Sequence, residues 1–156
     1  MDTTELEFRR EDLTSTIATA LIGALNAELV ELYPEEDSNH FRLDQEEVAE
    51  GRGAFLVCYG NGQPVACGAI RRLDAEVAEI KRMFVEPGSR GRGIGKRLLT
   101  ALEAEARRLG VTRLVLETGV RQPEALLLYA RAGFVRVPGF GGYAGSPLGV
   151  CLAKEL

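Results

Sequence analysis

One stretch decides the fold of this chain: Ala78-Glu-Ile-Lys-Arg-Met-Phe-Val-Glu-Pro-Gly-Ser-Arg-Gly-Arg-Gly-Ile-Gly-Lys-Arg-Leu-Leu99. Residues 77–85 have β-branched and aromatic residues at their ends and stop at Pro87-Gly88, which predicts a strand. Apolar residues then recur at helical spacing, with Glu103 and several arginines off the stripe, at Ile94, Leu98, Leu102, Ala106 and Leu109. A strand therefore meets a helix through a loop of glycine and arginine.

This junction suits a phosphate or a diphosphate. The first turn of a helix leaves backbone N–H groups without partners, and the peptide dipoles place partial positive charge there. Glycines have no Cβ, so a ligand can approach their backbone closely, and basic side chains add full charges. The loop supplies both kinds of residue, at Gly91, Gly93 and Gly95 and at Arg90, Arg92 and Lys96.

Two common nucleotide-binding patterns do not fit the loop. A Walker loop needs a glycine where Arg90 stands and a Ser or Thr where Arg97 stands. A dinucleotide fingerprint needs Gly-x-Gly-x-x-Gly, whereas the glycines here alternate with single residues, and only Glu117 could supply its acidic residue. A glycine-rich turn with solvated arginines and no ligand remains an alternative.

A third pattern, Arg/Gln-x-x-Gly-x-Gly/Ala between a strand and a helix, fits residues 90–95 in full. It resembles the acetyl-CoA-binding motif of the GCN5-related N-acetyltransferase (GNAT) superfamily. Two further segments resemble that superfamily in the same order: Glu79-Ile80 followed by Met83-Phe84-Val85, and Leu128-Tyr129-x-x-x-Gly133-Phe134. The resemblance covers roughly residues 55–134 and is strongest to a bacterial branch without an assigned substrate.

The resemblance implies acetyl-CoA as cosubstrate and assigns residues to it. The strand backbone would bind the pantetheine arm, and the loop would bind the diphosphate. Gln122 stands where family members often carry an asparagine that contacts the cofactor. The implied cofactor-binding residues are Met83, Phe84, Val85, Arg90, Gly91, Arg92, Gly93, Ile94, Gly95, Lys96 and Gln122.

The resemblance also implies a reaction, direct attack of a neutral amine on the thioester. A backbone N–H near Phe84 would stabilise the oxyanion, and Tyr129 would protonate the leaving thiolate as general acid. Glu79 stands at the family's base position; its alternative role is an ion pair with Lys81 on the same strand face. Deprotonating a lysine-like amine at pH 7 costs about 4.6 kcal/mol, against about 1.4 kcal/mol for an α-amino group, so only the first strongly needs a base.

Charged residues on neighbouring strands suggest an acceptor that carries a carboxylate as well as an amine. Arg71, Lys81 and Glu117 are expected to converge on one side of the sheet, where they pair or meet a polar ligand. We predict a small, amino acid-like substrate with Arg71 or Lys81 on its carboxylate. The alternatives are a non-catalytic acyl-CoA sensor and a protein N-acetyltransferase. The lone histidine, His40, lies in a polar loop and is interpreted as a surface residue.

Length and composition predict one globular domain over residues 1–156, since the chain is 46% hydrophobic and 27% charged. A net charge of −4 with dispersed arginines argues against nucleic-acid binding. No apolar stretch or leader-like start suggests a membrane or export, so we expect a cytoplasmic protein, monomeric or homodimeric. Three irregularly spaced cysteines give no metal or disulfide pattern and are expected to be reduced core residues, Cys58, Cys67 and Cys151.

The rest of the chain predicts a mixed α/β fold of six or seven strands and about four helices. Asn61-Gly62 between two apolar runs predicts a β-hairpin, and the strand–helix–strand passage after residue 77 predicts a parallel pair. Expected strands are residues 6–9, 54–59, 64–72, 77–85, 113–117, 134–137 and 149–153; expected helices are 13–33, 45–50, 94–109 and 123–132, the first capped by Asp12 or Thr14. Residues 138–147 are expected to form a loop.

Overall fold

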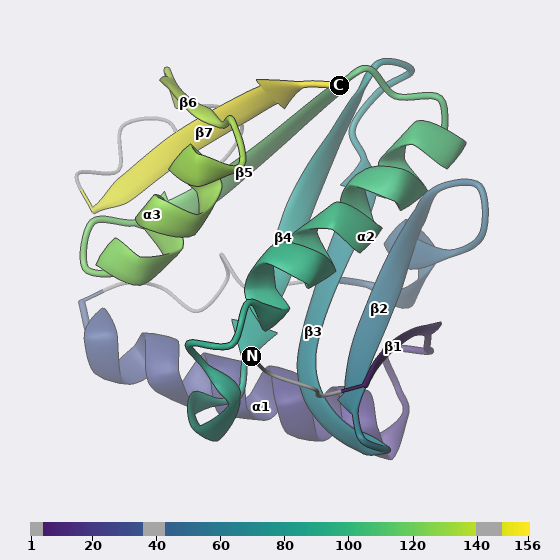
Figure 1. Ribbon diagram of the computed structural model, residues 1–156. Helices are drawn as coiled ribbons and strands as arrows, with labels where there is room; N and C mark the ends of the chain where they lie inside the picture. The colour runs from purple at the N-terminus through teal and green to yellow at the C-terminus, as the bar shows by residue number, and fades with distance from the viewer. Residues whose placement is uncertain (1–4, 36–42, 140–147) are drawn as a thin grey trace.

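The computed structural model describes residues 5–35, 43–139 and 148–156. In this part of the chain a seven-stranded mixed sheet has the order β1-β2-β3-β4-β5-β7-β6, with helices on both faces (Figure 1). The strands are β1 (Leu6–Arg10), β2 (Gly53–Gly60), β3 (Gln63–Arg72), β4 (Val77–Val85), β5 (Arg113–Gly119), β6 (Val135–Val137) and β7 (Gly149–Glu155). The helices are α1 (Thr16–Leu32), α2 (Ile94–Arg108) and α3 (Pro123–Arg131), with short 3₁₀ turns at η2 (Gln45–Val48) and η3 (Pro87–Ser89). The predicted α/β class is confirmed.

Strands β2, β3 and β4 form an antiparallel meander. The β2–β3 turn has Asn61 at φ 51° and Gly62 at φ 83°. Two successive residues with positive φ make the turn type whose twist matches the strands, and asparagine and glycine are the residues that tolerate it. The predicted hairpin is therefore confirmed.

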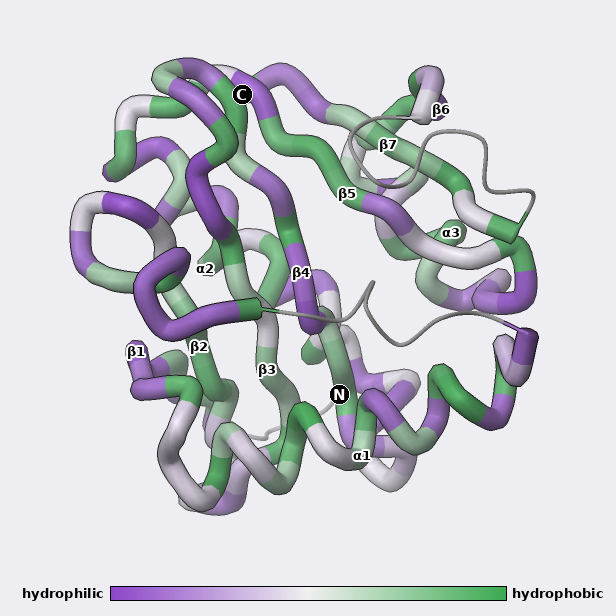
Figure 2. Tube along the Cα trace, turned by 180° about the vertical axis from the view of Figure 1, so that it is seen from behind, coloured by the Kyte–Doolittle hydropathy of each residue, from purple (hydrophilic) through white to green (hydrophobic). Residues whose placement is uncertain are grey.

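Alternating residues of β2 separate two cores. Ala54, Leu56 and Cys58 belong to the cluster under α2, whereas Phe55, Val57 and Tyr59 pack in the cluster under α1. Both faces of β2 are thus buried, because successive side chains of a strand point to opposite faces. Figure 2 shows α1 running across one face of the sheet with α2 behind it.

The sheet opens between β4 and β5. These strands pair in parallel only from Val77 opposite Arg113 to Ile80 opposite Leu116. Beyond Ile80, strand β4 bulges: Ala69 pairs with Lys81 and Cys67 with Phe84, which leaves one extra residue on β4. A bulge bends its strand and breaks the pairing pattern, so the last residues of β4 and β5 diverge and leave a cleft.

Several predicted boundaries were wrong by a few residues. Helix α1 begins at Thr16 with Ser15 as its cap, because the Ser15 hydroxyl accepts from the Ala18 N–H at 3.0 Å, while Asp12 bonds Thr14 instead. Three α-helices are present among the described residues rather than about four, since residues 45–48 form only a 3₁₀ turn. Strands β5 and β7 extend further than expected, to Gly119 and Glu155, because they pair along their whole length.

Glu103 is a further difference, because it is 7% exposed although it lies off the apolar stripe of α2. Its carboxylate accepts from the Lys154 ammonium on β7 at 2.7 Å. The attraction within an ion pair offsets part of the cost of burying a charged group.

Candidate active site

Two cavities meet where β4 and β5 diverge. One is a groove of about 1110 Å³ that runs past residues 90–96 and between α2 and α3. The other is a pocket of about 140 Å³ between α1, β4 and β5. Five residues line both, Leu25, Met83, Gln122, Ala125 and Tyr129. A ligand in the groove and a second molecule in the pocket would therefore come into contact beside Tyr129.

The glycine-rich loop lines one end of the groove. Gly91 and Gly93 have φ of 80° and 78°, a conformation that glycine adopts without strain. Helix α2 begins at Ile94 with no side-chain cap, and the first intrahelical bond to Gly93 comes from the Arg97 N–H. The earlier N–H groups of this turn are therefore open to an anion. Of the predicted loop residues, Arg90, Gly91, Gly93, Ile94, Gly95 and Lys96 line the groove, whereas Arg92 is exposed and does not.

Arg90 ties the loop to α1 and to β4. Its Nε donates to the Val85 carbonyl at 2.8 Å, and its Nη2 lies 2.9 Å from the Glu28 carboxylate. Glu28 lines the groove as well. The guanidinium thus neutralises a carboxylate that would otherwise repel a phosphate.

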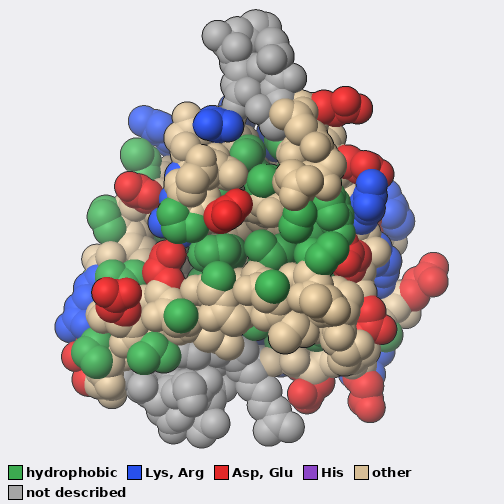
Figure 3. Space-filling model, turned by 90° about the horizontal axis from the view of Figure 1, so that it is seen from below, with side chains coloured by type: hydrophobic (Ala, Val, Ile, Leu, Met, Phe, Trp, Pro, Cys, Tyr) green, Lys and Arg blue, Asp and Glu red, His purple; other side chains and the backbone are tan. Residues whose placement is uncertain are grey.

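The groove also presents an apolar surface. Met83, Phe84 and Val85 line it from β4, and Ile94, Leu99 and Leu128 line it from the helices. Seen from below the sheet, hydrophobic side chains gather across the middle of this end of the molecule, with charged side chains of both signs toward its edges (Figure 3). Such a lining suits a ligand with a long, weakly polar arm.

Tyr129 lies at the junction of the two cavities. Its side chain comes from α3, is 6% exposed, and meets the Phe134 ring edge-on at 5.6 Å. Burial raises the pKa of Tyr129 well above its usual value, since the phenolate is less well solvated than in water. The phenol is therefore protonated throughout the physiological pH range. In that form it can serve as a general acid but not as a general base.

Glu79 lies at the inner end of the pocket and is 1% exposed. Its Oε1 accepts from Arg71 at 2.9 Å from Nε and 2.8 Å from Nη2. Its Oε2 is buried and has no hydrogen-bond partner among the described residues. Glu79 therefore forms an ion pair with Arg71 from the neighbouring strand, and the Lys81 charge also interacts with it. One carboxylate oxygen remains to accept a proton or a hydrogen bond.

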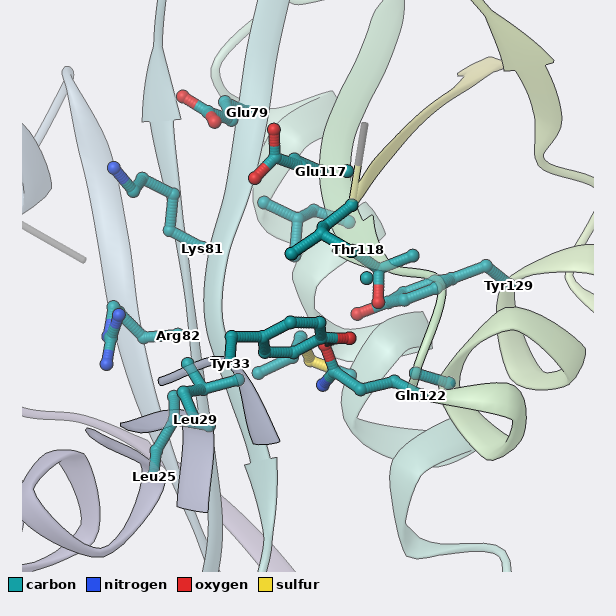
Figure 4. Close-up of a pocket in the computed structure, with 16 residues that line it drawn as sticks. Leu25, Leu29, Tyr33, Glu79, Lys81, Arg82, Glu117, Thr118, Gln122 and Tyr129 are labelled. Atoms are coloured by element: carbon teal, nitrogen blue, oxygen red, sulfur yellow. Dashed lines mark hydrogen bonds between the residues drawn. The ribbon is translucent and has the colours of Figure 1, made fainter. Parts of the chain in front are cut away.

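The predicted convergence of charged side chains occurs, with one exception. Lys81 and Glu117 line the pocket with Glu79, but Arg71 does not, because it lies behind Glu79 and is held by Glu47 as well. Figure 4 shows Glu79 and Glu117 at one end of the pocket and Lys81 with Arg82 along one side. Burial lowers the pKa of Lys81, and the nearby Glu79 carboxylate opposes that shift.

Sequence reasoning missed the residues that α1 and the β4 bulge contribute. Leu25, Leu29 and Tyr33 form a wall of the pocket from α1. Arg82 sits at the bulge with φ 58°, a left-handed conformation rare for a side chain of this size, and its guanidinium bonds Asn26 of α1. The helical spacing of Leu25, Leu29 and Tyr33 was visible in the sequence, but not which face of the sheet the helix would cover. His40 lies outside the described residues.

Metal and membrane sites are not evident in the described part of the chain. No group of three or more His, Cys, Asp or Glu side chains could hold a metal ion there. No described helix is both long enough and apolar enough to cross a bilayer. The three cysteines are buried free thiols, as predicted, and burial raises the pKa of Cys67 to about 12.

The chain is similar to known acetyltransferases along most of its length. The model of the acetyltransferase (GNAT) family matches residues 18–134. The IAA acetyltransferase of Azospirillum brasilense is 43% identical over 149 residues, covering 94% of this chain and 95% of the relative. The crystal structure of a candidate acyl-CoA N-acyltransferase from Klebsiella pneumoniae has a TM-score of 0.80 at 32% identity, with 97% of each chain covered. A GNAT acetyltransferase from Elizabethkingia anophelis with acetyl-CoA bound shares the fold, with a TM-score of 0.69 at 20% identity over 97% of this chain and 98% of that one.

Proposed function

Because the chain belongs to the GNAT family of acetyltransferases, we propose that it moves the acetyl group of acetyl-CoA onto the primary amine of a small, amino acid-like molecule. One observation carries this proposal: a groove lined by an anion-binding loop and a pocket lined by a buried carboxylate meet at a protonated tyrosine. The meeting point is where a thioester and an amine would have to come together.

The groove has the features that coenzyme A requires. The open N–H groups at the start of α2, with Lys96, would bind the diphosphate, and β4 at Met83–Val85 would lie along the pantetheine arm. The bulge after Lys81 takes Arg82 and Met83 out of regular pairing with β3, and the pairing resumes where Phe84 lies opposite Cys67. We assign one N–H of this segment as the hydrogen-bond donor to the developing oxyanion, since a fixed donor at that point usually makes the largest contribution to stabilising the transition state.

Glu79 is assigned as the base. The Oε2 atom is buried in the pocket and is the carboxylate oxygen that Arg71 does not use. It accepts a proton from the incoming ammonium, directly or through water, and leaves a neutral amine that attacks the thioester carbon. This assistance is worth most for amines of high pKa, for which deprotonation at pH 7 costs about 4.6 kcal/mol.

Tyr129 is assigned as the acid. As the new C–N bond forms and the C–S bond breaks, the sulfur leaves with the electron pair and takes the phenolic proton. The products are the acetylated amine and free coenzyme A. The amide nitrogen loses its remaining extra proton through solvent to the Tyr129 phenolate, and Glu79 releases its proton to solvent. Burial of Tyr129 keeps the phenolic proton in place until the leaving group needs it.

The charges around the pocket favour a zwitterionic acceptor. Among the described residues, two carboxylates and two cations line it, Glu79, Glu117, Lys81 and Arg82. A molecule with one ammonium and one carboxylate leaves this balance unchanged, whereas a polyamine would not. Lys81 is the group assigned to the acceptor carboxylate, since Arg71 is committed to two glutamates. The relative named IAA acetyltransferase supports a small-molecule acceptor.

An amine screen tests the proposal. Purified protein is mixed with acetyl-CoA and a panel of amino acids, diamines, simple amines and proteins with free N-termini, and free thiol is followed over time. We expect turnover with amino acid-like acceptors, and Lys81→Met should raise their KM while a simple amine is unaffected. Binding of acetyl-CoA without turnover on any amine would indicate a sensor instead, and turnover on protein N-termini alone would indicate a protein acetyltransferase.

A further inference from the structure

Tyr33 connects α1 to the turn between β5 and α3. It follows the last residue of α1, and its side chain is 6% exposed. The hydroxyl oxygen accepts a hydrogen bond from the backbone N–H of Arg121 at 3.0 Å, and it lies 3.3 Å from Oε1 of Gln122. In Figure 4 the Tyr33 ring lies across the pocket, with its hydroxyl beside the Gln122 amide.

The backbone beneath the hydroxyl is shaped to receive it. A Cβ atom added to Gly119 would lie 1.8 Å from the hydroxyl oxygen and 2.3 Å from the ring carbon that bears it, which no side chain tolerates. Gly119 does not have a positive φ, so its backbone conformation is open to any residue. Glycine is therefore required at this position for the close approach of Tyr33.

Arg121 holds the ring from the other side. Its guanidinium lies 5.4 Å from the ring centroid, a distance at which a cation is attracted to the aromatic face. The same guanidinium donates to the Leu32 carbonyl at 2.7 Å and bonds Glu35. The position of the Tyr33 hydroxyl is thus determined by contacts on three sides.

These contacts decide which way the Gln122 amide points. The hydroxyl oxygen accepts from the Arg121 N–H, and the hydroxyl donates its one hydrogen to the carbonyl oxygen of Gln122, 3.3 Å away. Gln122 also occupies the cap position of α3, but its side chain makes no capping bond to the helix. With Oε1 committed to Tyr33, the amide presents its NH₂ group as the end available to a ligand.

Gln122 lines both the groove and the pocket, next to Tyr129. A coenzyme A molecule with its diphosphate at residues 90–96 must pass its pantetheine arm between that loop and Tyr129. We propose that Tyr33 is a positioning residue for this arm: it fixes Gln122 so that Nε2 donates to a carbonyl oxygen of the pantetheine. This inference rests on the proposed function, because it assumes that coenzyme A occupies the groove.

Comparing the binding of two ligands separates the contribution of the pantetheine arm from that of the nucleotide. The dissociation constants of coenzyme A and of adenosine 3′-phosphate 5′-diphosphate, its nucleotide part alone, are measured by calorimetry. Tyr33→Phe should weaken coenzyme A about fivefold, as expected for one neutral hydrogen bond. The nucleotide should bind Tyr33→Phe and the original protein equally. Tyr59→Phe is the matched control, because the hydroxyl of Tyr59 bonds Glu11 and neither residue lines either cavity.

A second pair of variants tests the direction of the amide. Gln122→Glu keeps an oxygen for Tyr33 but replaces the donor NH₂ by an acceptor, so it should weaken coenzyme A at least tenfold and leave the nucleotide unchanged. In a Gln122→Ala background, Tyr33→Phe should have no further effect on coenzyme A, because Tyr33 acts through Gln122. The acceptor KM should change less than twofold in Tyr33→Phe, since the ring that lines the pocket is retained.

The outcomes separate the inference from the function beneath it. Failure of the original protein to bind coenzyme A would overturn the proposed function. Binding of coenzyme A that is unchanged in Tyr33→Phe, or unchanged in Gln122→Glu, would overturn only the role of Tyr33. Equal weakening of both ligands in Tyr33→Phe would show a general loosening of the fold and would overturn that role as well.

Discussion

Substitution of Glu79 by glutamine is the sharpest test of the site. The change preserves the shape of the side chain and keeps an oxygen for Arg71. In the original protein, Nε and Nη2 of Arg71 lie 2.9 and 2.8 Å from Oε1 of Glu79. It removes the charge and the basicity of Oε2, the oxygen that has no partner among the described residues. Hydrogen bonds to a charged group are worth about 1.5–3 kcal/mol, so we expect a loss of unfolding free energy of about that size.

The effect on the reaction should depend on the acceptor. Neutralising an amine of pKa near 10.4 costs about 4.6 kcal/mol at pH 7, and neutralising one of pKa near 8 costs about 1.4 kcal/mol. Without a base, the enzyme depends on the small fraction of amine that is already neutral. We expect Glu79→Gln to lower kcat/KM about 100-fold for the first kind of amine and about tenfold or less for the second.

The assay is thiol release at pH 6.5 to 9 with one acceptor of each kind. In the variant, kcat/KM should follow the fraction of neutral amine: it should rise about tenfold per pH unit for the amine of pKa near 10.4 and level off above about pH 8 for the other. The original protein should show a shallower rise with the first amine. Glu47→Gln is the matched control, because Glu47 is the other carboxylate on Arg71 and does not line the pocket. An equal loss with both amines, or an equal loss in Glu47→Gln, would show that Glu79 acts only through its ion pair.

Three other outcomes follow from the pKa directions and from burial. Tyr129→Phe should lower kcat at least 100-fold with little change in coenzyme A affinity. Because burial raises the pKa of Tyr129, ionisation of this tyrosine should cause no loss of rate in the original protein below about pH 10. A kcat of Tyr129→Phe within fivefold of the original would show that Tyr129 is not the general acid. Because burial lowers the pKa of Lys81, the Lys81 charge should be lost as pH rises through a value below the usual 10.5. Acceptor KM should therefore increase in that range in the original protein but not in Lys81→Arg. Parallel profiles of KM against pH in the two proteins would contradict this role of Lys81. The buried thiols, Cys58, Cys67 and Cys151, should resist an aromatic disulfide reagent at pH 8 until the protein is unfolded in denaturant, and rapid reaction of the folded protein would show that the core opens.

Local signals in the sequence predicted much of the fold because they act over a few residues. The Asn61-Gly62 turn, the proline and glycine that end β4, and the stripe on α2 each specify backbone geometry within one turn or one hairpin. The strand–helix–strand order then predicted that β4 and β5 pair in parallel, which they do. Boundaries such as the start of α1 depended on competition between Asp12, Thr14 and Ser15, which sequence alone did not resolve.

Predicting the ion-pair partners of the charged residues requires knowledge of the register of the sheet. The alternation along β4 placed Lys81 on the same face as Glu79, but the antiparallel pairing with β3 sets Arg71 directly opposite Glu79. Cross-strand neighbours lie closer than residues two apart on one strand. The pairing register is a long-range property, so the sequence pattern could not show it.

The sequence by itself determined the glycine-rich loop that we propose binds an anion, because loop and helix start are adjacent in the chain, and it placed Tyr129 and Glu79 among the candidate residues. Only the tertiary structure decided how they meet. The β4 bulge opens the sheet, α1 closes the pocket with Tyr33, and Gly119 leaves room for that ring. These three features join segments that lie dozens of residues apart, and packing between such segments depends on the whole fold rather than on any local pattern.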